Sequence, residues 1–297
     1  MNKEISMIIK GQPEFIGFFP IIRSLPNKEI SMVGHFIFLD QMPLKTYPTQ
    51  EFKDGVAKMG DTSHPHRGIA TFTYLLKGGI EHFDSAGHHG IVGEGGIQWM
   101  KAGNGIVHEE VIVVDDDKPT VSLNGMQFWI NLPAENKAEN PDYMAVQNED
   151  IPELELPDGV GSIRVLIGEY AGAVSPIPIY SELFNYHIKI NVGQTFTTQI
   201  DKNHEVALLI AKGSANVNGE AVALSELMSF KDDLAETIII ENNSDEAIDI
   251  LLFGGEPYTE SVVMGGPFIM NSSEGMALAN RDYHAGKYGE IDRKSKY

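Results

Sequence analysis

The sequence contains no cysteine. This absence excludes disulfide bonds, thiolate nucleophiles, structural zinc ribbons and iron–sulfur clusters, so any bound metal must be held by nitrogen and oxygen ligands. Positive charge is also scarce, since 22 lysine and arginine residues stand against 42 aspartate and glutamate residues and give a formal net charge of −20. Affinity for nucleic acids depends on clustered cations, so no direct nucleic-acid binding is expected.

Long apolar runs are missing as well. The longest uncharged stretches, such as residues 119–134, contain Asn, Gln and Pro and fall short of the roughly 20 apolar residues that cross a bilayer. At the N-terminus, Lys10 interrupts the apolar stretch too early for a signal peptide. We therefore expect a cytoplasmic protein with no membrane attachment.

What the chain does have is a series of short apolar or alternating runs broken by Gly, Asn, Asp and Pro. This pattern is typical of all-β proteins, and closely spaced strands indicate sandwiches or barrels. Strands are predicted at residues 35–39, 70–76, 126–132, 162–167, 186–190, 206–211, 237–240 and 248–253. Residues 275–287 have helical spacing instead and reach a glycine at Gly286, which predicts a short C-terminal helix.

The chain also divides into two halves. Residues 133–158 carry eight acidic residues and one lysine. We interpret them as an interdomain connection, with an acidic surface for a partner as the alternative. An apolar strand ending in Lys-Gly occurs in each half, at residues 73–78 and 207–213. This weak repeat predicts two copies of one small β-barrel, and we place the domains at residues 1–138 and 139–297.

Six of the ten histidines lie between His64 and His108. In an extended strand, residues i and i+2 point to the same face. His64 and His66 therefore share one strand face, and His108 and Glu110 share another. Two antiparallel strands carrying these pairs would bring three imidazole nitrogens and one carboxylate oxygen together. This ligand set suits divalent Fe, Ni, Cu, Mn or Zn and disfavours Ca and Mg. A six-coordinate metal would keep two open positions, which favours catalysis or sensing over a structural role.

Several longer motifs surround these ligands. They are His64-Pro65-His66-Arg67-Gly68, the run from Gln98 to Glu110, the run from Gly265 to Asn271, and Asp282-Tyr283-His284-Ala285-Gly286-Lys287. Together they resemble the pirin family of the cupin superfamily. The resemblance implies a bicupin, with two small jelly-roll β-barrels and a short C-terminal helix. It also implies that only the domain at 1–138 binds metal, and carried over position by position it selects the same four ligands, His64, His66, His108 and Glu110.

The resemblance implies two functions between which the sequence does not decide. The first is an iron-dependent dioxygenase that acts on flavonols such as quercetin, with dioxygen and a small planar aromatic molecule as substrates. Glu110 would then also be catalytic, accepting the flavonol hydroxyl proton. The second is a non-catalytic, redox-sensing regulatory protein, whose acidic surface suits a basic protein partner. A zinc-dependent hydrolase or isomerase ranks last because we find no organised general base for it.

Fe(II) is the expected metal, with Ni, Cu, Mn or Zn as alternatives, and a monomer is expected because both barrels lie in one chain. Four positions depart from the expected pattern. The pirin pattern places an aromatic residue and a glutamate where this chain has Ile69 and Ala70, and we expect Ala70 to share a strand face with His64 and His66. In the second half, the residues at the corresponding offsets from Lys212 are Gln199 and Asp201. We therefore expect the second barrel to lack a metal.

Overall fold

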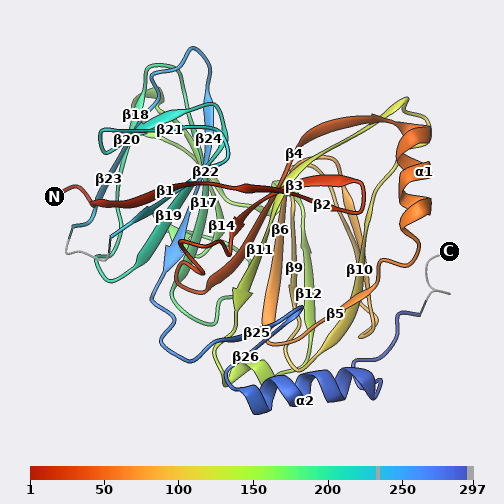
Figure 1. Ribbon diagram of the computed structural model, residues 1–297. Helices are drawn as coiled ribbons and strands as arrows, with labels where there is room; N and C mark the ends of the chain where they lie inside the picture. Colours follow the sequence, from red (N-terminus) through yellow and green to blue (C-terminus); the bar gives the residue numbers. More distant parts are fainter. Residues whose placement is uncertain (232–234, 293–297) are drawn as a thin grey trace. The chain divides into compact units, whose positions relative to one another are not determined.

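The computed structural model describes residues 1–231 and 235–292, and its regular structure is mostly β-strand (Figure 1). The described residues form two compact units, and each unit combines three segments of the chain. One unit comprises Glu14–Ile21, Asp40–Asn148 and Thr259–Tyr297, and the other comprises Met1–Pro13, Ile22–Leu39 and Glu149–Tyr258. No helix among the described residues is long and apolar enough to cross a membrane.

Two antiparallel sheets contain most of the strands of the unit with residues 40–148, and parts of β2, β3 and β4 are grouped with the other unit. The larger has the order β12-β9-β6-β11-β4-β3-β2, and the smaller has the order β5-β10-β7-β8. The seven strands of the larger sheet are β2 (Gln12–Ile16), β3 (Phe19–Leu25), β4 (Phe36–Pro48), β6 (Ile69–Lys77), β9 (Ile97–Lys101), β11 (Thr120–Asn131) and β12 (Asp142–Val146). The four strands of the smaller sheet are β5 (His64–His66), β7 (Ile80–Asp84), β8 (His89–Val92) and β10 (Ile106–Ile112). A β-ribbon of β25 (Val263–Gly265) and β26 (Phe268–Met270) and the helices α1 (Thr49–Met59) and α2 (Ser273–His284) complete this unit.

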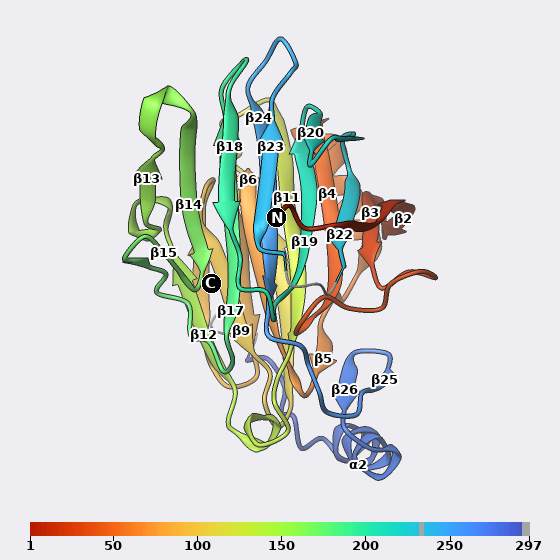
Figure 2. The same ribbon diagram turned by 90° about the vertical axis from the view of Figure 1, so that its left-hand side faces the viewer.

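The other unit repeats this plan, with sheet orders β1-β22-β19-β24-β17-β14-β13 and β18-β23-β20-β21 (Figure 2). The first sheet contains β1 (Ile5–Lys10), β13 (Glu153–Glu155), β14 (Gly161–Ile167), β17 (Leu183–Ile190), β19 (Glu205–Lys212), β22 (Glu226–Phe230) and β24 (Ile248–Gly255). The second contains β18 (Thr195–Gln199), β20 (Ala215–Val217), β21 (Glu220–Val222) and β23 (Thr237–Glu241), and a short ribbon joins β15 (Glu169–Tyr170) to β16 (Ala173–Val174). Alternate residues of β17 and β19 are buried in one apolar cluster, so their inward faces form a hydrophobic core.

The predicted strands are confirmed, since each lies within or largely within a strand of the structure. The sheets are not closed barrels, however, and each unit pairs a seven-stranded sheet with a four-stranded one. The predicted C-terminal helix is confirmed as α2. It begins at Ser273, because the hydroxyl of Ser272 caps its first turn by accepting from the Gly275 amide at 3.0 Å.

Helix α1 was not predicted. Its sequence contains Gly55, a poor helix former, and Phe52 is its only buried residue. The aromatic rings of Phe18, Phe19 and Tyr47 pack against Phe52, with ring centroids 5.5 to 5.7 Å away. Tertiary packing against these rings, rather than helix propensity, therefore holds α1.

The acidic stretch at residues 133–158 is folded rather than extended. It contains β12, β13 and three short 3-10 helices, η1 (Asn136–Ala138), η2 (Asn148–Asp150) and η3 (Pro157–Gly159). The chain passes from one compact unit to the other between Asn148 and Glu149, within this stretch. The domain boundary expected after residue 138 stays a prediction, and in the structure each unit combines three segments.

Lys137 in η1 carries a buried amine, which makes the free energy of unfolding depend on pH. Its side chain is only 4% exposed, and its Nζ donates to Asn131 Oδ1 at 2.7 Å and to the Ile269 carbonyl at 3.0 Å. Burial lowers the pKa of Lys137 to about 8, against the opposing attraction of Glu260. In the unfolded chain the pKa is about 10.4, so between these values the unfolded state binds more protons and stability rises with pH.

We therefore expect the free energy of unfolding of the wild type, relative to that of Lys137→Met, to increase by about 1–3 kcal/mol between pH 7.5 and pH 10. Methionine keeps the length of the side chain but has no titratable group, so the difference between the two proteins isolates this amine. Urea unfolding at several pH values measures it. Parallel stability curves for the two proteins would contradict the prediction.

Candidate metal centre

The three histidines predicted as metal ligands lie on two paired strands of the four-stranded sheet. β5 and β10 are antiparallel, with His108 directly opposite His64. His66 is two residues further along β5 and therefore shares the face of His64. One candidate ligand atom from each of the three imidazoles lies within 4.8 Å of the other two, and the Nε2 atoms of His64 and His108 are 3.1 Å apart. The structure thus brings together three of the four predicted ligands.

Backbone carbonyls fix the orientation of two of these rings. The Nδ1 atom of His64 lies 3.0 Å from the carbonyl of Thr62, and the Nδ1 atom of His66 lies 3.2 Å from the carbonyl of Pro267. A carbonyl oxygen only accepts, so each Nδ1 carries the proton and each Nε2 keeps a free lone pair. Metal-bound histidines commonly donate their other ring N–H to a carbonyl or carboxylate in this way, which fixes the ring for metal binding. The buried Nδ1 of His108 has no hydrogen-bond partner among the described residues.

Burial keeps two of the imidazoles neutral. Burial and the neighbouring His64 lower the pKa of His66 to about 3, although the hydrogen bond to Pro267 opposes this shift. Burial also lowers the pKa of His108 well below its usual range, and the neighbouring imidazoles of His66, His64 and His82 lower it further. Neutral imidazole is the form that binds a metal ion. The three converging nitrogens therefore fit a divalent transition metal.

Glu110, the fourth predicted ligand, is not part of the group of three converging donors. Its Oε1 accepts from Gln98 Nε2 and, at 3.4 Å, from Thr73 Oγ1, while its Oε2 accepts from Gln127 Nε2 at 3.0 Å. These donors come from β6, β9 and β11, so the seven-stranded sheet holds the carboxylate. Coordination by Glu110 stays a prediction, and the structure adds three polar partners that the sequence did not identify.

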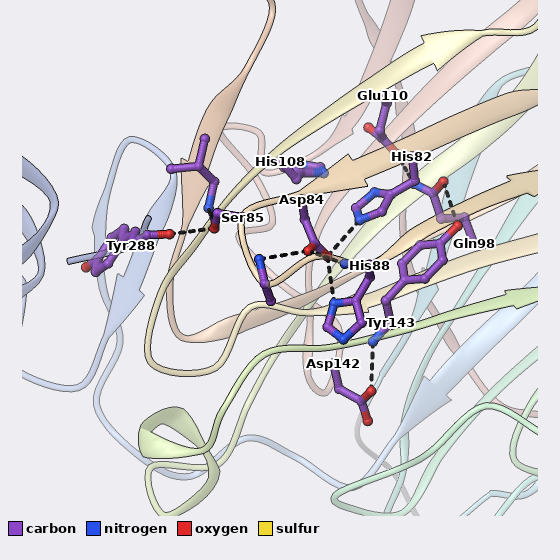
Figure 3. Close-up of polar contacts among 12 residues, drawn as sticks. His82, Asp84, Ser85, His88, Gln98, His108, Glu110, Asp142, Tyr143 and Tyr288 are labelled. Atoms are coloured by element: carbon purple, nitrogen blue, oxygen red, sulfur yellow. Dashed lines mark hydrogen bonds and ion pairs between the residues drawn. The ribbon is translucent and has the colours of Figure 1, made fainter. Parts of the chain in front are cut away.

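A second polar cluster begins on β7, next to His108 of the neighbouring strand β10 (Figure 3). His82 lies opposite Glu110 in the strand pairing and is fully buried, with its ring centroid 5.5 Å from that of His108. Asp84 accepts from His82 Nε2 at 3.0 Å and from His88 Nδ1 at 2.9 Å. Burial alone would raise the pKa of Asp84, but the hydrogen bonds from the two histidines outweigh it and lower the pKa. Tyr143 from β12 stacks on His82 with ring centroids 4.1 Å apart.

One expectation about this site is wrong. Ala70 does not share a strand face with His64 and His66, because it lies on β6 in the seven-stranded sheet, whereas both histidines lie on β5. Gly68 separates the two strands with a φ of +80°. On β6, Ala70 alternates with Thr71 and Thr73, and Thr73 is the residue that faces Glu110. The missing glutamate therefore removes no carboxylate from the histidine-bearing strand.

The fold and this site define a class of protein. Two jelly-roll units, one of which carries three converging imidazoles, make a bicupin with a candidate mononuclear metal centre. The pirin family model matches residues 19–130, and the model of the pirin C-terminal cupin domain matches residues 185–289. The chain belongs to the pirin family.

Individual relatives agree with this assignment. A pirin-like protein of Caulobacter vibrioides is 32% identical over 290 residues, which cover 96% of this chain and 99% of that protein. Pirin of Rattus norvegicus is 30% identical over 289 residues, which cover 96% of this chain and 92% of that protein. The crystal structure of a quercetin 2,3-dioxygenase from Acinetobacter baumannii superimposes with a TM-score of 0.87 and 26% identity over 98% of this chain and 99% of that one.

Proposed function

We propose that this protein is an iron(II)-dependent dioxygenase that acts on flavonols such as quercetin. The observation that carries the proposal is the convergence of His64, His66 and His108, with two of the rings oriented by backbone carbonyls. The similarity to the Acinetobacter baumannii quercetin 2,3-dioxygenase supports this choice of reaction. We propose a monomeric, cytoplasmic enzyme in which the other barrel holds no metal.

The protein's part in the reaction is to hold the metal and to prepare the substrate. Iron(II) held by His64, His66 and His108 would supply redox-active Lewis-acid chemistry. His64 and His66 present their Nε2 atoms because Thr62 and Pro267 bind the opposite nitrogens. Trp129 packs edge-on against His66 with ring centroids 4.9 Å apart, which places an aromatic wall beside the imidazoles. Such a wall favours a planar aromatic ligand.

Glu110 is the group that we propose accepts the flavonol hydroxyl proton. It is only partly buried, and Gln98 and Gln127 hold it by one oxygen each. A carboxylate oriented in this way can accept a proton from a hydroxyl group within hydrogen-bond distance. Glu110 is also the proposed fourth metal ligand, and it is the residue whose replacement tests both roles.

Oxygen consumption is the direct test of this function. Protein reconstituted with Fe(II) and given quercetin is expected to consume dioxygen in step with quercetin over many turnovers. A His108→Ala protein that retains its circular dichroism spectrum is expected to consume none, because one of the three converging donors is gone. Parallel reconstitution with Ni, Cu, Mn and Zn shows which metal supports turnover.

The opposite result would change the assignment. A full complement of bound iron without oxygen uptake would contradict the dioxygenase and favour the redox-sensing regulatory protein. In that case the affinity for a protein partner should change with the oxidation state of the iron.

A further inference from the structure

The C-terminal segment, defined here as residues 263–289, folds against the metal-bearing strands of its own unit. It consists of β25, β26, α2 and the turn that follows, and Figure 1 shows it beside the end of β5. The carbonyl of Pro267 accepts the Nδ1 proton of His66 at 3.2 Å. The orientation of one predicted ligand therefore depends on a residue 201 positions away in the sequence.

The residue next to His66 is tied to the same segment. The Arg67 Nη1 atom donates to Asp282 Oδ2 at 3.0 Å and to the Tyr288 hydroxyl at 3.3 Å. The Arg67 carbonyl accepts from the Ile269 amide at 3.1 Å, which forms a parallel bridge between Arg67 and Phe268. Arg67 and Asp282 are both largely buried, with side chains 12% and 11% exposed. These contacts fix the chain at the end of β5 through both the backbone and the side chain of Arg67.

The C-terminal segment also contacts β10, the strand that carries His108. Ser85 Oγ donates to the Tyr288 carbonyl at 2.5 Å and accepts from the Val107 amide at 3.0 Å (Figure 3). The ring of Tyr288 lies so close to Gly105 that a Cβ atom there would be 2.3 Å from it. The turn after α2 thus contacts Gly105, which precedes β10, and is linked through Ser85 to Val107, the residue before His108.

An apolar cluster anchors the segment in this position. Phe268, Met270, Ala279 and Tyr288 are buried together, and Val107 and Met276 pack against them. Val107 is the residue immediately before His108, so the cluster reaches the metal-bearing strand. Loss of this docking would release His66 and β10 together.

From these contacts we infer that docking of the C-terminal segment positions the metal ligands, so that docking and metal binding are coupled. The inference rests on the metal centre of the proposed function. Arg67, Asp282, Ser85 and Tyr288 are its positioning residues, because they touch the ligand strands and not the metal. Coupling of this kind is reciprocal, so bound metal must stabilise the docked segment by the same factor as docking raises the metal affinity.

Cobalt(II) binding to the intact protein tests this inference without any reliance on activity. Asp282→Asn removes the charge that Arg67 binds and is expected to weaken Co(II) binding by about 10-fold, the low end of the loss seen when residues that orient metal ligands are replaced. The matched control is Lys287→Ala, which removes another partner of Asp282, an exposed amine at 2.7 Å. We expect this control to keep the wild-type affinity. Competition with a chromophoric chelator measures affinity and dissociation rate, and the visible spectrum of Co(II) reports the ligand geometry.

A second variant and a second measurement distinguish the positioning of the ligands from a general loss of stability. Ser85→Ala removes the link between Tyr288 and Val107 and is expected to weaken metal binding by about 10-fold, with faster metal release, because it loosens a ligand-bearing strand. In the wild type, Co(II) is expected to slow tryptic cleavage at Arg281 and Lys287, and in Asp282→Asn this protection should shrink by the factor lost in affinity.

The outcomes separate this inference from the proposed function. A wild type that binds no Co(II) would overturn the metal centre and the coupling with it. A wild type that binds Co(II), with unchanged affinity in Asp282→Asn and Ser85→Ala and unchanged proteolysis, would overturn the coupling alone. Equal weakening in Asp282→Asn and Lys287→Ala would also contradict it, because only the first variant loses the ion pair with Arg67.

Discussion

Replacing His108 with alanine is expected to lower the metal affinity of the protein by more than about 100-fold. Loss of a partner that merely orients a ligand costs 10–100-fold, so loss of one of three converging imidazoles must cost more. His108 is fully buried, and its Nε2 points at that of His64 at 3.1 Å, so nothing from solvent replaces it without rearrangement. Isothermal titration with Co(II) or Ni(II), together with metal analysis of the purified protein, measures the effect.

His89→Ala is the matched control for this experiment. His89 lies on β8 of the same sheet with its side chain 48% exposed, and it bonds to Glu81 at 2.8 Å rather than to the three histidines. We expect this variant to bind metal as the wild type does. Wild-type affinity in a folded His108→Ala protein would show that the three imidazoles do not form the metal site.

Strand alternation was sufficient to predict that the imidazoles of the three histidines converge. His64 and His66 are two residues apart on β5, and the antiparallel pairing puts His108 opposite His64. A side-chain period of two depends only on the extended backbone, so it can be recognised in the sequence of a short strand. The same reasoning placed Glu110 on the face of His108 but did not show which atoms would surround its carboxylate.

The residues that orient these ligands could not be predicted, because they are distant in the sequence or act through the backbone. Pro267 contributes a carbonyl group, which every residue has, and no side-chain pattern marks it. Gln98 and Gln127 reach Glu110 from two strands of the opposite sheet, and their register is set by tertiary packing. A sequence signal did exist for the contact between His82 and Asp84. These two residues are spaced by two, like His64 and His66, so they share one strand face.

The likeness of the two halves predicted the repeated barrel but not the grouping of the chain ends. The first strand, β1, pairs with β22, so the N-terminus belongs to the unit formed mainly by residues 149–258. The last helix, α2, packs on β26 in the other unit. Apolar periodicity shows that a segment is a strand or a helix, whereas its partner is chosen by long-range packing.

Replacing Glu110 with glutamine is the second change with a large expected effect. The substitution keeps the size of the side chain but removes its capacity to accept a proton, so we expect the rate of quercetin oxidation to fall by about 100-fold or more. The amide NH₂ of the new side chain would also meet a donor, either Gln127 Nε2 at the position of Oε2 or Gln98 Nε2 and Thr73 Oγ1 at the position of Oε1. Oxygen uptake at saturating quercetin measures the rate, and titration with Co(II) measures the metal affinity.

The two measurements separate the two roles of Glu110. A lower rate at unchanged metal affinity identifies a proton acceptor that is not a ligand, because the three imidazoles then suffice to hold the metal. A lower rate together with weaker binding identifies a ligand that is needed before any reaction begins. Glu81→Gln is the control, since Glu81 lies on β7, pairs with His89 and has a side chain 31% exposed. Full turnover and full metal binding in Glu110→Gln would remove both roles and leave the site with three histidines alone.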